Sequence, residues 1–169
     1  MTHRTEPHFD DMYRDIILDH YRRPRGRAPI AAADIENEGF NPVCGDEVKV
    51  SLKLEGDRVK EVAVTGRGCA ISTASGSMLA ELLPGKSLSE VEALADGMKQ
   101  MMHNGGVPRG IEIGDLDALE GVKKFPVRIK CALLSWVTLA DAIKAWKAGQ
   151  NHSGSSSTTE QEGKGGFAL

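Results

Sequence analysis

Hydrophobic and polar residues alternate strictly through residues 47–54, and this alternation predicts a half-buried β-strand. The apolar face consists of Val48, Val50, Leu52 and Leu54. A turn at Gly56-Asp57 leads into a second run over 59–65, so we expect a hairpin. A shorter strand around 34–37 would complete a three-stranded antiparallel sheet.

Apolar residues at helical spacing predict helices over 9–22, after Cys69 as far as Pro84, over 88–102 and from Pro126 to about Ala148. A shorter helix is expected over 115–119. Ser87 and Glu90 have the spacing of a capping box at the start of the third helix. The methionines of this helix are expected to fill the core rather than bind a ligand.

This order of elements favours one α+β domain over residues 1–149, in which helices cover one face of a small antiparallel sheet. Residues 150–169 are rich in Gly, Ser and Thr and without periodicity, so we expect a disordered tail. The net charge is −3, so the composition shows no excess of basic residues of the kind that binds nucleic acid. No apolar run has the length of a membrane helix, and the first residues do not resemble a signal peptide. We therefore expect a cytoplasmic protein without a membrane partner.

Two polar features allow a structural or a functional interpretation. The run of Arg22, Arg23, Arg25 and Arg27 is either a solvated surface or a docking patch for an acidic partner. His20 either packs the first helix or contacts a partner, and packing is the preferred interpretation.

Three cysteines, Cys44, Cys69 and Cys131, lie at the ends of predicted elements or near them. They are 25 and 62 residues apart and form no CxxC pair, which excludes a zinc finger and a thioredoxin-type dithiol. Spacing alone leaves two possibilities: the three thiols share one site, or each is buried separately as a small apolar group.

Asp46 favours the shared site, because residues i and i+2 of an extended chain point to the same side. Cys44 and Asp46 could then face one metal ion. Three sulfurs and one oxygen suit tetrahedral zinc, and such a site has a net negative charge that needs cations nearby. Arg67 and Arg128 adjoin ligands in the sequence, although either could simply be a surface residue.

Four linked segments make the chain similar to a known family. They are residues 12–25 (MYRDIILDHYRRPR), 41–46 (NPVCGD), 66–75 (GRGCAISTAS) and 128–136 (RIKCALLSW). In this order they resemble the IscU/NifU-N family of iron–sulfur cluster assembly proteins, and within it the SufU branch. The resemblance extends over about residues 9–148.

Three features of the chain are similar to the SufU branch rather than to the scaffold members. Lys130 stands where scaffold members have a histidine before the third cysteine. The 62-residue gap, with its Gly-rich stretch over 103–109, looks like the insertion of that branch. Arg128 matches its characteristic arginine.

The resemblance implies a zinc-dependent sulfurtransferase. Cys44, Asp46, Cys69 and Cys131 would bind Zn²⁺, and Cys44 would accept persulfide sulfur from the cysteine desulfurase SufS. We expect Cys44 to leave the metal for this reaction, because it lies in a Pro/Gly loop whereas the other two thiols lie at helix starts. Arg128 would stabilise the Cys44 thiolate. A downstream partner would be the SufBCD assembly complex.

Two alternatives remain. Three thiolates and a carboxylate could also hold an iron–sulfur cluster, which would make the protein a scaffold. A non-catalytic zinc module that only binds a partner is the third possibility.

Overall fold

The computed structural model describes residues 9–103, 106, 109–149 and 156–158. At its centre is an antiparallel sheet of β1 (Ile35–Asn41), β2 (Asp46–Glu55) and β3 (Arg58–Arg67), with β2 in the middle. The alternating residues of β2 place Val48, Val50 and Leu52 in the core, as predicted. β1 continues to Asn41 rather than ending near 37, because its backbone pairs with β2 as far as Asp46.

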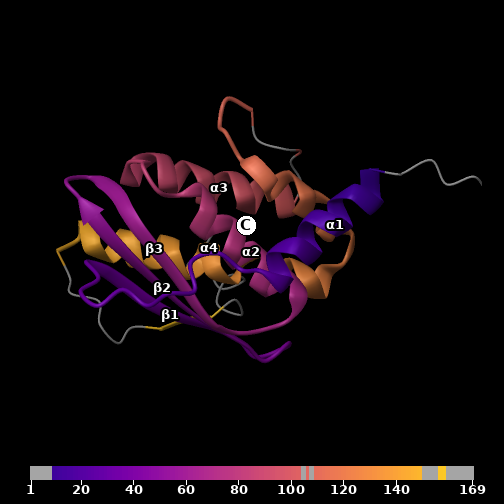
Figure 1. Ribbon diagram of the computed structural model, residues 1–169, viewed down its shortest axis with the longest axis horizontal. Helices are drawn as coiled ribbons and strands as arrows, with labels where there is room; N and C mark the ends of the chain where they lie inside the picture. The colour runs from indigo at the N-terminus through magenta and orange to yellow at the C-terminus, as the bar shows by residue number, and fades with distance from the viewer. Residues whose placement is uncertain (1–8, 104–105, 107–108, 150–155, 159–169) are drawn as a thin grey trace, which may run out of the picture.

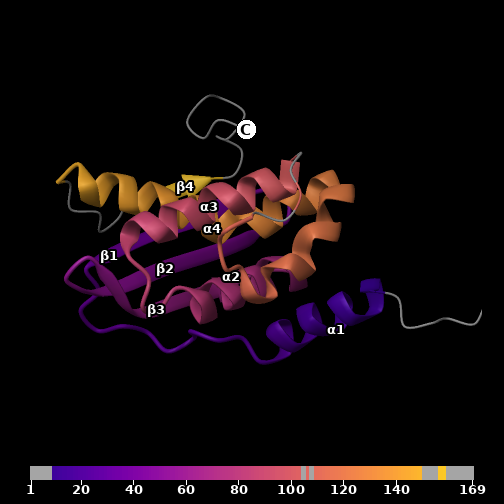
Figure 2. The same cartoon turned by 90° about the horizontal axis from the view of Figure 1, so that it is seen from above.

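Helices cover one face of this sheet. They are α1 (Phe9–Arg22), α2 (Ala70–Leu82), α3 (Leu88–His103) and α4 (Pro126–Lys147). Figures 1 and 2 show α2, α3 and α4 on the same side of the strands, while α1 lies at the end of the molecule against α2. The predicted α+β architecture is confirmed.

The segment before α4 is a 3₁₀ helix, η1 (Gly114–Lys124), and is longer than the predicted helix over 115–119. Its large buried side chains, Leu116, Leu119 and Val122, recur every third residue, and Ala118 is buried beside them. A helix with three residues per turn places all of them on one face, which explains why this segment is 3₁₀ rather than α.

The two edges of the sheet are paired differently. At β3, the N–H of Val64 donates to Gly26 O, and the N–H of Val59 donates to Lys86 O. At β1, a short parallel strand, β4 (Ser156–Thr158), pairs with residues 38–40. The structure thus differs from the expected disordered tail at residues 156–158, because the open edge of β1 offers backbone partners. Residues 150–155 and 159–169 lie outside the described part, and the domain boundary at 149 stays a prediction.

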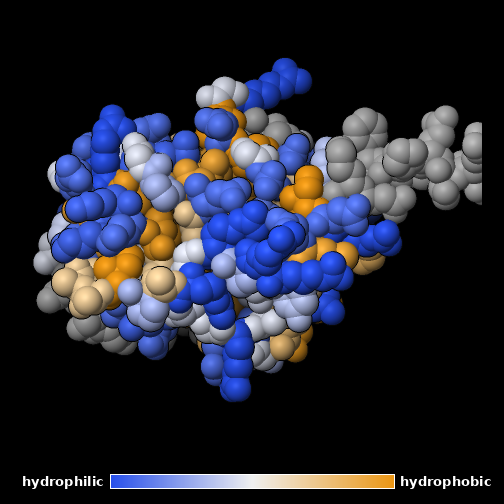
Figure 3. Space-filling view, viewed as in Figure 1, coloured by the Kyte–Doolittle hydropathy of each residue, from blue (hydrophilic) through white to orange (hydrophobic). Residues whose placement is uncertain are grey.

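The core between sheet and helices is apolar and contains Met98, Met101 and Met102, which confirms their role as core residues. Trp136 on α4 is buried and donates its indole N–H to Ser75 Oγ over 3.1 Å. The face in Figure 3 is mostly hydrophilic, with hydrophobic side chains in a few separate places. Among the described residues, no helix combines the length and apolarity needed to cross a membrane.

Candidate metal centre

Cys44 lies on a tight turn between β1 and β2 that is held by Asn41. The N–H of Gly45 donates to Asn41 O over 2.8 Å, and the N–H of Val43 donates to Asn41 Oδ1 over 3.2 Å. Gly45 has a φ of +72°, a conformation that favours glycine. The turn leaves the Cys44 side chain half-exposed and directs the next polar residue, Asp46, into the interior, where it is fully buried.

Cys69 caps the N-terminus of α2. Its backbone is extended, and its sulfur accepts a hydrogen bond from the N–H of Ser72 over 3.4 Å. Its own N–H donates to Asp46 Oδ1 over 2.8 Å. The preceding residue must be small, because a Cβ at Gly68 would lie 2.8 Å from the same oxygen. The sequence Gly-Cys therefore brings the start of α2 into contact with the start of β2.

Cys131 lies in the buried part of α4, and its sulfur is 3.1 Å from the sulfur of Cys44. A disulfide would require about 2.05 Å, and the cysteines are free thiols. The donor atoms of Cys44, Asp46 and Cys131 all lie within 4.8 Å of one another. Cys69 lies just outside this group, with its sulfur 4.0 Å from Asp46 Oδ2. The fold thus brings all four predicted ligands together.

The thiols of Cys69 and Cys131 shift each other's pKa in opposite directions. Hydrogen bonding from Cys131, followed by the backbone N–H of Ser72, lowers the pKa of Cys69 to about 6, although burial opposes this shift. Donation to Cys69, and then burial, raises the pKa of Cys131. The hydrogen bond between the two thiols, supported by the N–H of Ser72, therefore favours a thiolate at Cys69 beside a protonated Cys131.

Of the two candidate cations, the structure brings Arg128 to the thiols. Its Nη1 lies 3.9 Å from Cys44 Sγ, and the neighbouring thiols, Cys131 first, raise the pKa of the guanidinium. The Arg67 side chain is 84% exposed and lies 3.7 Å from Glu47 instead. Arg67 is therefore a surface residue of β3.

The donor set fits a divalent metal ion. Zinc binds thiolates at about 2.3 Å and carboxylates at about 2.0–2.2 Å, so ligand atoms within 4.8 Å of one another need only small shifts to share an ion. Thiolates also bind iron, so ligand type alone does not select the metal.

Asn41 is a further site residue that the sequence analysis did not single out. Its Nδ2 lies 3.4 Å from Asp46 Oδ2 and 3.6 Å from Cys131 Sγ. A buried amide can therefore stabilise the negative charge of these ligands. The sequence feature that could have identified Asn41 is its position as the first residue of the segment Asn-Pro-Val-Cys-Gly-Asp.

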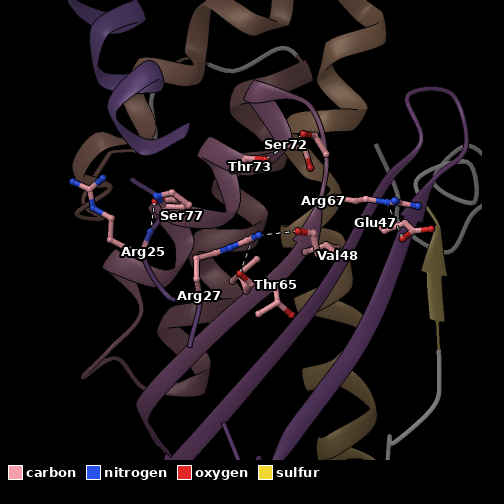
Figure 4. A pocket seen from close by; sticks show the side chains of 13 residues that line it. Arg25, Arg27, Glu47, Val48, Thr65, Arg67, Ser72, Thr73 and Ser77 are labelled. Atoms are coloured by element: carbon pink, nitrogen blue, oxygen red, sulfur yellow. Dashed lines mark hydrogen bonds and ion pairs between the residues drawn. The ribbon is translucent and has the colours of Figure 1, made fainter. Parts of the chain in front are cut away.

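Two arginines of the basic run, Arg25 and Arg27, line a pocket beside the start of α2 (Figure 4). Arg27 donates to Gly66 O over 2.8 Å and to Val64 O over 3.3 Å. Arg23 and Arg25 both pair with Asp19, so these three arginines bind groups of their own chain. Arg25 also pairs with Glu81 of α2, so Arg25 and Arg27 fasten the segment after α1 to α2 and to β3.

Comparison with known proteins finds the same family. The model of the NifU-like N-terminal domain matches residues 12–132, a span that contains all four candidate ligands. The chain is 37% identical over 140 residues to the zinc-dependent sulfurtransferase SufU of Bacillus subtilis, covering 83% of this chain and 95% of that protein. It is 38% identical over 133 residues to the iron–sulfur cluster assembly scaffold protein IscU of Streptococcus pyogenes, covering 79% and 83%.

A solved structure is also similar. The iron–sulfur cluster assembly scaffold protein for the SUF system from Fervidobacterium islandicum matches with a TM-score of 0.68 and 33% identity, over 76% of this chain and 94% of that one. The likeness therefore includes the fold as well as the sequence.

Proposed function

The chain belongs to the family of NifU-like N-terminal domains, and on this premise we propose that it is a zinc-dependent sulfurtransferase of iron–sulfur cluster assembly. It accepts sulfur from the persulfide of a cysteine desulfurase, for which SufS is the candidate. The observation that carries the proposal is the position of Cys44, a half-exposed thiol with a cation 3.9 Å away and further thiols beside it.

Cys44, Asp46, Cys69 and Cys131 are the residues that would hold the zinc ion. When bound, zinc keeps its sulfur ligands deprotonated at neutral pH. The chain itself supports the negative charge through the Asn41 amide and the N–H of Ser72.

The transfer is a thiolate–disulfide-type exchange at sulfur. The Cys44 thiolate attacks the terminal sulfur of the donor's persulfide, and a new S–S bond forms on Cys44. The S–S bond of the donor breaks, and the donor cysteine leaves as a thiolate with the bonding electron pair. The terminal sulfur keeps its proton throughout, so Cys44 becomes the persulfide and no oxidant is needed.

Cys44 is the acceptor among the three thiols because a bulky donor can reach it. Cys131 is fully buried, and the Cys69 sulfur is occupied by the N–H of Ser72. The flanking Pro42 and Gly45 are exposed, so nothing of this turn blocks access to the sulfur. Arg128 stabilises the thiolate form, which is the nucleophile. The sulfur then passes to a downstream assembly partner such as the SufBCD complex.

The direct test is sulfur transfer from a desulfurase and cysteine to the wild-type protein and to Cys44→Ser. Mass spectrometry of the alkylated peptides should find one additional sulfur atom on the Cys44 peptide of the wild type. The same peptide in Cys44→Ser should stay unmodified, and stimulation of desulfurase turnover should be lost. A variant that is still persulfidated on Cys69 or Cys131 at the wild-type rate disproves the assignment.

A scaffold that carries an iron–sulfur cluster is the second candidate function. It is favoured by the same donor set and by the similarity to the Streptococcus pyogenes scaffold protein. Protein purified without added iron separates the two candidates: one zinc ion per chain supports sulfur transfer, and a brown, labile cluster supports the scaffold. A non-catalytic zinc module would instead keep partner binding in Cys44→Ser, and the substitution would cause no sulfur-transfer defect.

A further inference from the structure

A second group of metal-binding side chains lies at the junction of α1, α2 and η1, and it includes no cysteine. His20, Glu81 and Asp115 come from these three elements, and their ligand atoms all lie within 4.8 Å of one another. His20 Nε2 is 2.8 Å from Asp115 Oδ2 and 3.9 Å from Glu81 Oε1. The imidazole is completely buried, whereas the side chains of Asp115 and Glu81 are 42% and 46% exposed. An ion can thus enter past the carboxylates and reach a fixed nitrogen.

The imidazole is held from behind by Ser77. His20 Nδ1 lies 2.7 Å from Ser77 Oγ, and the same oxygen accepts the backbone N–H of Arg25 over 2.8 Å; Figure 4 shows Arg25 beside Ser77. A hydroxyl oxygen has two lone pairs, so it can accept from Nδ1–H and from Arg25 together. In that tautomer, Nε2 directs a lone pair at the carboxylates. Histidines that bind metals are commonly oriented through the other ring nitrogen in this way.

Arg25 pairs with only one oxygen of Glu81 and leaves the other available to an ion. Arg25 pairs with Asp19 and with Glu81 Oε2, and Arg23 also pairs with Asp19. Glu81 therefore has its second oxygen, Oε1, directed toward His20 and Asp115. Two carboxylates and one neutral imidazole match the ligands preferred by first-row divalent ions.

We propose that His20, Glu81 and Asp115 form a second metal site, which binds a divalent transition ion such as Zn²⁺ through nitrogen and oxygen alone. The bound ion would join α1 to α2 and η1. Without the ion, the other tautomer makes the contacts: Nε2–H donates to Asp115 Oδ2, and Nδ1 accepts from the Ser77 hydroxyl. The site is independent of sulfur transfer, because none of its ligands lies in the thiol centre.

The experiment is a calorimetric titration of the full-length protein with Zn²⁺ after the thiol centre has been saturated and excess metal removed. We expect one further equivalent to bind. Glu81→Gln and Asp115→Asn should each weaken this event at least about tenfold, since even an outer-shell change costs about 10–100-fold in metal affinity. Both amides keep the size of the side chain, and the amide oxygen introduced by Asp115→Asn would still accept a hydrogen bond from Nε2–H, so these variants should fold. Glu120→Gln on η1, where Glu120 pairs with Lys123, is the matched control and should bind like the wild type.

Cobalt identifies the ligands. Co²⁺ added to the zinc-saturated protein should produce weak visible bands without a thiolate-to-metal charge-transfer band, and Glu81→Gln should abolish them. The proposal is overturned if no further equivalent binds, or if the further equivalent survives in both Glu81→Gln and Asp115→Asn. Neither result bears on Cys44, so failure here and failure of sulfur transfer are distinguishable.

Discussion

The backbone N–H of Cys69 donates a hydrogen bond to Asp46 Oδ1 over 2.8 Å and so joins the start of α2 to the start of β2. The other oxygen of the carboxylate lies 4.0 Å from the Cys69 sulfur and 3.4 Å from Asn41 Nδ2. Asp46 is completely buried. One side chain thus fixes the position of a second candidate ligand while offering an oxygen to the metal.

Replacement of Asp46 separates these two roles. Asp46→Ala should destabilise the metal-free protein by about 1–3 kcal/mol, because the Cys69 N–H loses its acceptor. Asp46→Asn keeps an acceptor oxygen and should cost less, yet both variants lose the anionic ligand and should bind zinc more weakly. Urea denaturation measures the first effect, and competition with a chromophoric chelator measures the second. If the two metal-free variants are equally stable, the hydrogen bond from the Cys69 N–H does not contribute to the stability of the fold.

Removal of zinc should lower the midpoint of thermal unfolding and desulfurase stimulation together. Binding to the folded state alone stabilises a protein by about 4 kcal/mol at free metal about 1,000 times the Kd. Calorimetry before and after chelation, with the metal content verified, measures the shift. A variant with serine at all three cysteines is the control and should not respond to the chelator. An unchanged midpoint in the metal-free wild type would contradict a structural role for zinc.

The capping box at the start of α3 predicts a pH-dependent contribution to stability. The N–H of Glu90 donates to Ser87 Oγ over 3.2 Å, and the N–H of Ser87 donates to Glu90 Oε1 over 3.1 Å. This second bond, the largest cause, lowers the pKa of Glu90 below its ordinary value of 4.5. A lowered pKa in the folded state gives stability that is present above the unfolded pKa and is lost as the pH falls through the folded one.

Ser87→Ala should therefore cost about 0.5–2 kcal/mol near neutral pH, the usual effect of losing an N-cap. The difference from wild type should narrow as the pH falls below the lowered pKa of Glu90, because the interaction of the Ser87 side chain with the ionised carboxylate, which only the wild type has, is then lost. Urea denaturation in the two pH ranges measures this, with Ser89→Ala, an exposed serine two residues later, as the control. If the difference in the free energy of unfolding between Ser87→Ala and wild type stays constant with pH, the Ser87 side chain does not stabilise the ionised Glu90.

Local patterns predicted most of the fold. α1 occupies the predicted residues, and the capping box formed as expected, because each depends on neighbours along the chain. The 3₁₀ geometry of η1 and the pairing of β4 with β1 depend on surfaces built by distant segments. No local pattern specifies those surfaces, so neither feature could be predicted.

The candidate site shows the same division. Its four candidate ligands were predicted from their residue types, from the spacing of Cys44 and Asp46, and from the family resemblance, and the fold brings them together. Sequence position alone did not separate Arg67 from Arg128, because both adjoin ligands, and only the family resemblance favoured Arg128. The β2–β3 register places Arg67 opposite Glu47, whereas Arg128 on α4 lies beside Cys44.

This difference between the two arginines gives a matched pair of variants. Arg128→Ala should slow sulfur transfer to Cys44 roughly tenfold, less than the loss of a buried donor to a developing charge, because Arg128 is exposed and screened by solvent. Added salt should reduce the deficit, and Arg128→Lys should recover part of the rate, since it restores the charge without the guanidinium geometry. Arg67→Ala should transfer sulfur like the wild type, and the zinc content of all three variants should be unchanged. The rate of persulfide formation under single-turnover conditions measures the effect. If Arg67→Ala and Arg128→Ala lose the same fraction of this rate, general surface charge, rather than the contact of Arg128 with Cys44, supports the reaction.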